Sequence, residues 1–141
     1  MSNQATFIKA VNVISKTHRE IGTLGEAIAV EYLKRHGFSV VEQNVSRKTG
    51  EIDIVARNGE VLHFVEVKTI LTEEFPKEGD IGDAYDPSLN LHETKIRKVA
   101  RTGEWYTLEK GWEGEWQVDG CLVWIRRSDG MAKVRYLPQI A

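Results

Sequence analysis

Two runs of β-forming residues, 51–56 and 61–68, restrict the fold of this chain more than any other feature. Asn58-Gly59 stands between them, and an Asn-Gly pair between such runs is the strongest short-range sign of a β-hairpin. A two-residue turn at this pair would connect two adjacent antiparallel strands. The sequence therefore predicts a β-hairpin over 51–68.

The expected turn also determines which charged side chains face each other. It pairs Arg57 with Glu60, places Glu51 opposite Glu66 and leaves Asp53 diagonal to Glu66 on the same face. Opposed carboxylates destabilise a strand pair unless a cation compensates them. This face is therefore interpreted as a metal site or, alternatively, as the solvent-facing polar side of an amphipathic hairpin.

Lys68 shares the face of Glu66 and supplies one positive charge. A hard divalent cation such as Mg²⁺ would supply the rest, because it binds one or two carboxylates together with water and phosphate oxygens. Such an ion polarises a phosphodiester and its bound water, and a nearby lysine orients the water or stabilises the developing charge. The cluster favours phosphodiester hydrolysis with Mg²⁺, for which Mn²⁺ is the expected substitute.

The rest of the chain alternates between helical and strand patterns, and Gly37 marks the end of the first helix. The expected elements are a helix over 17–36, a strand over 38–44, the two hairpin strands, a helix over 91–108, and strands over 116–126 and 133–137. Alternation of this kind predicts an α/β fold, with a mixed β-sheet flanked by α-helices.

The 141 residues correspond to about one domain. We expect an N-terminal extension over 1–20, forming a short helix or tail, and a single domain over 21–141 with an acidic loop at about 70–90. One cysteine, Cys121, permits no internal disulfide, and no signal peptide or membrane-spanning stretch is visible. These features predict a cytoplasmic protein with no membrane partner.

A net charge of −2 argues against a protein held on nucleic acid by bulk positive charge. The charge is unevenly spread, however, because residues 70–90 hold six acids and one base. The remainder of the chain therefore has a basic excess, and a DNA-facing surface could be appreciably positive.

The hairpin residues resemble the PD-(D/E)xK nuclease signature. Asp53 matches the aspartate of the signature, and Glu66 and Lys68 match its (D/E)xK pair. The resemblance extends to the YraN-like family of small bacterial proteins, which are predicted endonucleases similar to Holliday-junction resolvases. It implies a restriction-endonuclease-like fold that acts on DNA.

The YraN-like pattern covers about residues 22–123. Its other matches are Gly22, Gly25-Glu26, Ala29, Tyr32-Leu33, Gly37, Asn44, Lys95 and Lys98. The chain departs from the family in two places. Thr69 follows Lys68 where the family usually has an arginine one or two residues after the lysine, and Gln117-Val118-Asp119 stands where the late strand often reads Arg-Phe-Asp. These departures bear on substrate preference more than on the metal site.

The resemblance implies a helix glutamate near the metal, and Glu26 lies at the border of the apolar arc of its helix. The expected metal ligands are therefore Asp53, Glu66, Glu26 and Glu51, and the expected catalytic residues are Asp53, Glu66 and Lys68. Glu26 could instead be a solvated helix residue, and Glu51 could bind a second metal or only stand at the entrance of its strand.

Lys95, Lys98 and Arg101 recur at helical spacing and form the expected nucleic-acid-binding face, with an ordinary solvated face as the alternative. Trp105, Tyr106, Trp112 and Trp116 either pack in the core or stack on unpaired bases. The four histidines lack zinc spacing, and the chain has neither a nucleophile elbow nor a P-loop, so no nucleotide cofactor is expected.

The sequence thus predicts a Mg²⁺-dependent endonuclease acting on DNA, including branched DNA, with homodimerisation as a route to cutting two strands. Two other functions stay open. One is a nucleic-acid-binding module that keeps the fold without cleaving, and the other is an interaction protein whose acidic loop binds a protein partner.

Overall fold

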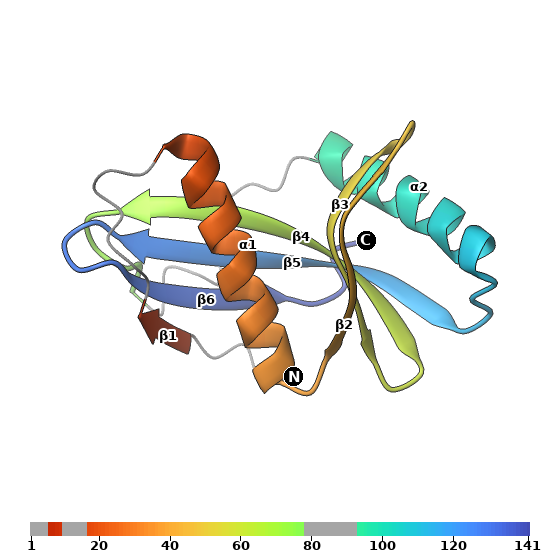
Figure 1. Cartoon of the computed structure of the whole chain (residues 1–141), viewed down its shortest axis with the longest axis horizontal. Coiled ribbons are helices and arrows are strands. Elements are labelled where there is room, and N and C mark those ends of the chain that lie inside the picture. Colours follow the sequence, from red (N-terminus) through yellow and green to blue (C-terminus); the bar gives the residue numbers. More distant parts are fainter. Residues whose placement is uncertain (1–5, 10–16, 78–92) are drawn as a thin grey trace.

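A single six-stranded β-sheet organises the protein (Figure 1). The computed structural model describes residues 6–9, 17–77 and 93–141, with backbone only for 6–9. The elements in chain order are β1 (Thr6–Lys9), α1 (His18–Arg35), β2 (Ser39–Arg47), β3 (Gly50–Asn58), β4 (Val61–Thr72), α2 (Glu93–Lys110), β5 (Glu115–Arg126) and β6 (Met131–Leu137). The order across the sheet is β1-β6-β5-β4-β3-β2.

The two helices cover opposite faces of this sheet. Consecutive side chains of β4 point to opposite faces, and Val65 belongs to the apolar cluster under α1 while Phe64 belongs to the cluster under α2. The α1 cluster includes Leu33, and the α2 cluster includes Val99. The expected α/β fold, a mixed β-sheet flanked by α-helices, is thereby confirmed.

The sheet is mixed because β4 and β5 are parallel, whereas the other neighbouring strands are antiparallel. The parallel ladder runs from Val61 opposite Glu115 to Thr72 opposite Arg126. A parallel pair requires a crossover connection, and α2 lies between the two strands in the chain. This crossover carries α2 across the sheet beside the β3–β4 hairpin, as Figure 1 shows.

Local sequence signals account for both ends of α1. The side chain of Thr17 accepts a hydrogen bond from the Glu20 backbone N–H, while the Glu20 carboxylate accepts one from the Thr17 N–H, which together form a capping box. Past the other end, Gly37 has a φ of +85°, a conformation that glycine adopts without strain. The expected first helix is therefore confirmed at both ends.

The segment expected to form a short helix or tail contains a strand instead. Residues Thr6–Lys9 form β1, which pairs antiparallel with β6 and completes one edge of the sheet. Most of the expected acidic loop, residues 78–92, lies outside the described residues. The first residues of the expected loop belong to β4, which continues to Thr72 and is therefore longer than the expected strand over 61–68.

The register of the β3–β4 hairpin differs from the expected register by two residues. The turn residues are Gly59 and Glu60, because Asn58 pairs with Val61. Gly59 has a φ of +61°, which suits the first central position of a type II′ turn. Placing the turn at Asn58-Gly59 was therefore wrong, since glycine occupies the first central position rather than the second.

This shift changes which acidic residue lies opposite Glu66, but Asp53 and Glu66 remain neighbours. The ladder ends at Ile54 opposite Val65, so the next step of the antiparallel register places Asp53, not Glu51, opposite Glu66. The expectation of Glu51 opposite Glu66 was wrong. A two-residue shift retains the side-chain alternation of the paired residues, and Asp53 remains next to Glu66 at the end of the ladder.

Candidate functional site

Asp53 and Glu66 form the centre of an acidic cluster where the β3–β4 ladder ends. The two neighbours of Asp53 in β3 pack on different sides of the sheet: Ile54 belongs to the α1 cluster and Ile52 to the α2 cluster. Side-chain alternation is thus interrupted at Asp53, and β3 turns from one helix layer toward the other. The two carboxylates consequently lie between the layers, within reach of both helices.

Glu66 is buried within this cluster, with a relative exposure of 1%. Lys95 from α2 supplies its counter-ion, with Nζ 2.6 Å from Oε1. Neither carboxylate oxygen has a hydrogen bond of ordinary geometry in the described part of the chain. Burial and the neighbouring Asp53 charge raise the pKa of Glu66 to about 7, although Lys95 acts in the opposite direction.

Asp53 is half-buried, and its side chain is hydrogen-bonded to the backbone of β4. Its Oδ2 accepts a hydrogen bond of 2.8 Å from the backbone N–H of Val67. Burial raises the pKa of Asp53, whereas the Val67 N–H and the Lys95 ammonium lower it. Because one oxygen is held by the backbone, the carboxylate has a fixed orientation beside Glu66.

Glu26 enters the cluster from α1, where it is half-buried. Burial raises the pKa of Glu26, and the charges of Asp53 and Glu51 add to the increase. The preceding residue, Gly25, brings the helix close to β4, because a Cβ at Gly25 would lie 1.8 Å from Oγ1 of Thr69. Only glycine permits this approach, which places Glu26 beside the strands.

Glu51 lies at the exposed end of the cluster. With Gly50 it borders a surface hollow of about 400 Å³, whose other side is lined by Thr94, Lys95 and Lys98 of α2. The Glu51 charge contributes to the raised pKa of Asp53 and of Lys95. Glu51 therefore acts on the cluster through its electric field, from the rim of the hollow.

Lys68 follows Glu66 on the same face of β4 and is half-buried. Within the described ranges it has no ion pair or hydrogen bond. The cation in contact with Glu66 is instead Lys95, whose pKa is raised chiefly by its interaction with Glu66. The structure thus pairs the buried carboxylate with a lysine from α2 and leaves Lys68 available.

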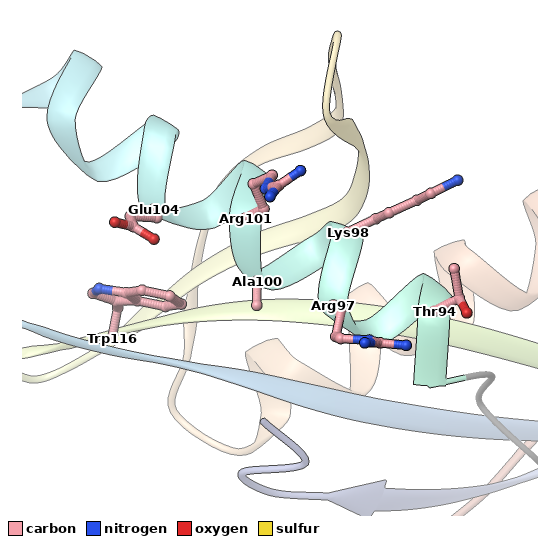
Figure 2. A pocket seen from close by; sticks show the side chains of 7 residues that line it. All are labelled: Thr94, Arg97, Lys98, Ala100, Arg101, Glu104 and Trp116. Atoms are coloured by element: carbon pink, nitrogen blue, oxygen red, sulfur yellow. The ribbon is translucent and has the colours of Figure 1, made fainter.

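Lys98 and Arg101 are exposed on α2, and Lys98 also lines the hollow beside Glu51. Both line a second hollow of about 480 Å³ beside the helix (Figure 2). Of the three residues of the expected basic face, Lys95 contacts Glu66. Two of them border the hollow in Figure 2, and the third neutralises the acidic cluster.

The cluster satisfies part of what a divalent metal requires. Among the residues that the structure describes, no three carboxylate, histidine or cysteine side chains are arranged to hold an ion. Two carboxylates are nevertheless suitable, because Glu66 is buried beside Asp53, and Asp53 is oriented by the Val67 N–H. Mg²⁺ is commonly bound by one or two carboxylates with water completing its shell. The pair Asp53 and Glu66 therefore fits such an ion.

A second buried polar cluster was not predicted from the sequence. The Asp119 carboxylate in β5 accepts hydrogen bonds from four donors, and one of these is His63 Nδ1 at 2.5 Å. The other donors are the Tyr136 hydroxyl, the Gln117 side chain and the Gln139 backbone N–H. Burial alone would raise the pKa of Asp119, but these donors lower it. The only sequence sign was an aspartate within an otherwise apolar strand.

Of the aromatic residues in and near α2, some pack in the core and others are exposed to solvent. Tyr106 is buried, and its hydroxyl donates a hydrogen bond of 2.9 Å to Glu42. Trp105 is 54% exposed on the outer side of α2. Trp116 is half-buried in β5 and lines the second hollow. Tyr106 therefore belongs to the core, while Trp116 is accessible from a hollow.

No helix within the described ranges is long and apolar enough to cross a membrane. The fold and the cluster define a class of α/β protein, one with a mixed sheet whose β3–β4 hairpin carries a pair of carboxylates, one of them buried. Residues 25–130 match the uncharacterised protein family UPF0102. The chain belongs to this family.

Two bacterial relatives illustrate the relationship. A UPF0102 protein of Campylobacter jejuni is 37% identical over 98 residues, which cover 70% of this chain and 78% of the relative. A UPF0102 protein of Helicobacter pylori is 34% identical over 110 residues, which cover 78% of this chain and 86% of the relative. The matched regions contain most of each protein.

Among solved structures, the chain is similar to SfsA of Pyrococcus furiosus, determined in complex with Ca²⁺. The TM-score is 0.36 with 15% identity, and the match covers 86% of this chain and 63% of SfsA. The chain thus spans less than two thirds of the length of SfsA.

Proposed function

We propose that this protein is a Mg²⁺-dependent endonuclease that hydrolyses phosphodiester bonds of DNA, including branched DNA. The observation that carries the proposal is that the Asp53 and Glu66 carboxylates lie together on two neighbouring strands, with Glu66 buried and Lys95 as its counter-ion. A buried carboxylate with a raised pKa inside a cluster of charges is typical of functional sites. The resemblance of the hairpin to the PD-(D/E)xK signature supports the same activity.

Asp53 and Glu66 would hold the metal, and Glu26 and Glu51 would add negative charge around it. A bound Mg²⁺ supplies Lewis-acid activation of the phosphodiester and a more acidic water. The Val67 N–H fixes the orientation of the Asp53 carboxylate. Lys68, which has no partner in the described residues, is available to orient the attacking water or to stabilise negative charge on the phosphate.

Cleavage of DNA tests the proposal directly. Linear, flapped and four-way-junction DNA are incubated with Mg²⁺ or Mn²⁺ and each of four proteins: the wild type, Asp53→Asn, Lys68→Ala and Glu60→Gln. Glu60 lies exposed in the turn of the same hairpin, so its variant is a matched control. We expect the wild type and Glu60→Gln to cut, and both site variants to lose at least about 100-fold in rate, as expected for removal of a charge-stabilising group.

Absence of metal-dependent cutting of all three substrates, by a folded protein that binds the metal, would overturn the enzyme assignment. A comparison of the substrates shows whether branched DNA is preferred. Sedimentation of the protein with and without the junction determines whether two copies act together, as a cut in both strands requires.

A nucleic-acid-binding module without catalysis is the second candidate. The contact of 2.6 Å between Lys95 and Glu66 favours it, because the ammonium already neutralises the buried carboxylate. Metal binding distinguishes the two candidates. For a nuclease, millimolar Mg²⁺ or Mn²⁺ raises the Tm of the wild type and of Glu60→Gln but not that of Asp53→Asn. An unchanged Tm in all three proteins supports the binding module.

A further inference from the structure

The second hollow lies along α2 and is lined by residues of mixed chemistry (Figure 2). Six of them come from α2 and one from β5: Thr94, Arg97, Lys98, Ala100, Arg101, Glu104 and Trp116. From Thr94 to Glu104 the helix rises about 15 Å at 1.5 Å per residue. The hollow is thus an elongated surface groove, which we call the α2 groove.

The α2 groove is adjacent to the candidate active site. Thr94 and Lys98 line both the α2 groove and the hollow that contains Glu51. Lys95, which contacts Glu66, also lines the latter hollow. A chain that follows the surface from the acidic cluster therefore passes the N-terminal turns of α2 and enters the groove.

Positive charge predominates in the α2 groove. Arg97, Lys98 and Arg101 line it, and Glu104 is the single acidic residue among the lining residues. Arginine and lysine that line a groove follow a phosphate backbone, and arginine forms two hydrogen bonds with one phosphate. The charge of the groove is therefore complementary to a polyanion, in contrast to the net charge of −2 on the whole chain.

Trp116 provides an aromatic surface at one end of the groove. Figure 2 shows it projecting from β5 toward α2, close to Glu104. Phe64 packs edge-on against it with ring centroids 5.5 Å apart, so the indole is held in place while it remains half-buried. A base within a duplex cannot stack on a ring in such a hollow, because both of its faces are covered by neighbouring bases. An unpaired base has a free face for stacking.

We infer that the α2 groove binds an unpaired strand of the DNA substrate, with phosphates on Arg97 and Arg101 and a base stacked on Trp116. This inference rests on the proposed function, since it names the part of the substrate that extends beyond the scissile site. It assigns roles to Arg97 and Trp116, neither of which belongs to the acidic cluster. It also predicts that DNA with a single-stranded extension is bound more tightly than blunt duplex.

Binding without cleavage tests the inference. Fluorescence anisotropy with EDTA present measures the Kd for a blunt 20-base-pair duplex and for the same duplex with a ten-thymidine extension. We expect the extension to tighten binding by the wild type about tenfold, the range expected for stacking of one base. Trp116→Leu, which retains an apolar contact for Phe64, should abolish this preference. Trp105→Leu is the matched control, because Trp105 lies on α2 but outside the groove.

Arg97→Gln and Arg101→Gln provide a second test that does not depend on the core, because both side chains are exposed. Each variant should weaken binding of the extended DNA and reduce the slope of log affinity against log salt by about 1. The inference is overturned if Trp116→Leu prefers extended DNA as strongly as the wild type and the Trp105→Leu control do. It is also overturned if the wild type has no such preference.

The result is independent of catalysis. If extended DNA is preferred but no metal-dependent cutting occurs, the groove is confirmed and the endonuclease proposal fails. If cutting occurs but the extension has no effect on binding, the endonuclease proposal stands and the groove assignment fails. Circular dichroism of each variant verifies that the fold is retained.

Discussion

The ammonium of Lys95 lies 2.6 Å from a carboxylate oxygen of Glu66, whose side chain is almost completely buried. The lysine side chain itself is 61% exposed, so the pair joins the surface of α2 to the interior of the hairpin. This single contact holds a positive charge at the place where a divalent cation would be needed. Several consequences for stability can be measured.

Glu66→Gln should stabilise the protein in the absence of metal. Burial and Asp53 raise the pKa of Glu66 from 4.5 to about 7, so ionisation of this residue opposes folding at alkaline pH. The amide carries no charge and avoids this cost. We expect the free energy of unfolding at pH 8 to increase by about 1–3 kcal/mol in urea titrations. A loss of stability would contradict the burial argument.

The effect of Glu66 should depend on pH in a defined direction. Because the folded-state pKa is higher than the unfolded value, the contribution of Glu66 to stability is fully present below about pH 4.5 and is lost as pH rises through about 7. The wild type should therefore lose stability relative to Glu66→Gln between pH 5 and pH 8. Parallel urea titrations across this range measure the difference, and a constant difference would refute the prediction.

Lys95→Gln should have the opposite effect. It removes the cation that lowers the pKa of Glu66 and of Asp53. Breaking a fully buried ion pair costs about 3–5 kcal/mol, and we expect about 1–3 kcal/mol here because the lysine is exposed. If the acidic cluster binds a divalent ion, added Mg²⁺ should raise the Tm of this variant more than that of the wild type. Lys98→Gln is the control, since Lys98 has no ion pair within the described ranges.

Gly25→Ala should destabilise the protein and displace Glu26. The new methyl group would lie 1.8 Å from Oγ1 of Thr69 and 2.8 Å from its Cβ. Such overpacking costs about 1–3 kcal/mol. Thr69→Ala in the same protein removes the closest contact, and thermal unfolding should then show partial recovery. Equal Tm values for Gly25→Ala and the wild type would show that α1 shifts freely on the sheet.

Asp119→Asn should destabilise the protein by about 2–4 kcal/mol, because buried donors lose a charged acceptor. Its four donors lower the pKa of Asp119 despite burial, so the stabilisation is present above the ordinary pKa of 3.8 and is lost as pH falls through the lower folded-state value. Acid unfolding monitored by circular dichroism should therefore begin at a higher pH for the variant. Glu113→Gln, which changes an exposed residue with no ion pair within the described ranges, is the control.

Local signals in the sequence were sufficient for much of the secondary structure. Thr17 and Gly37 delimit α1, and the β-branched runs of the hairpin form strands as expected. The register was misplaced because Asn-Gly is compatible with more than one two-residue turn, and residue preference alone does not select between them. The error left Asp53 next to Glu66, so the candidate site could still be recognised.

Contacts between distant parts of the chain could not be predicted. The pairing of Thr6–Lys9 with β6 depends on which sheet edge is free, a property of the assembled fold. The bond from His63 to Asp119 joins residues 56 positions apart and has no spacing pattern. Likewise, the helical period places Lys95 with Lys98 and Arg101, but the direction of a long side chain depends on the charges around it.

The parallel pairing of β4 and β5 also affects the rate of folding. The β3–β4 hairpin joins residues close in the chain, so Asp53 and Glu66 can meet through local contacts formed within microseconds. The β4–β5 pair joins strands that are separated in the chain by the whole segment that contains α2, and contacts between such distant residues form slowly. We therefore expect Asp53 and Glu66 to come together before β5 joins the sheet.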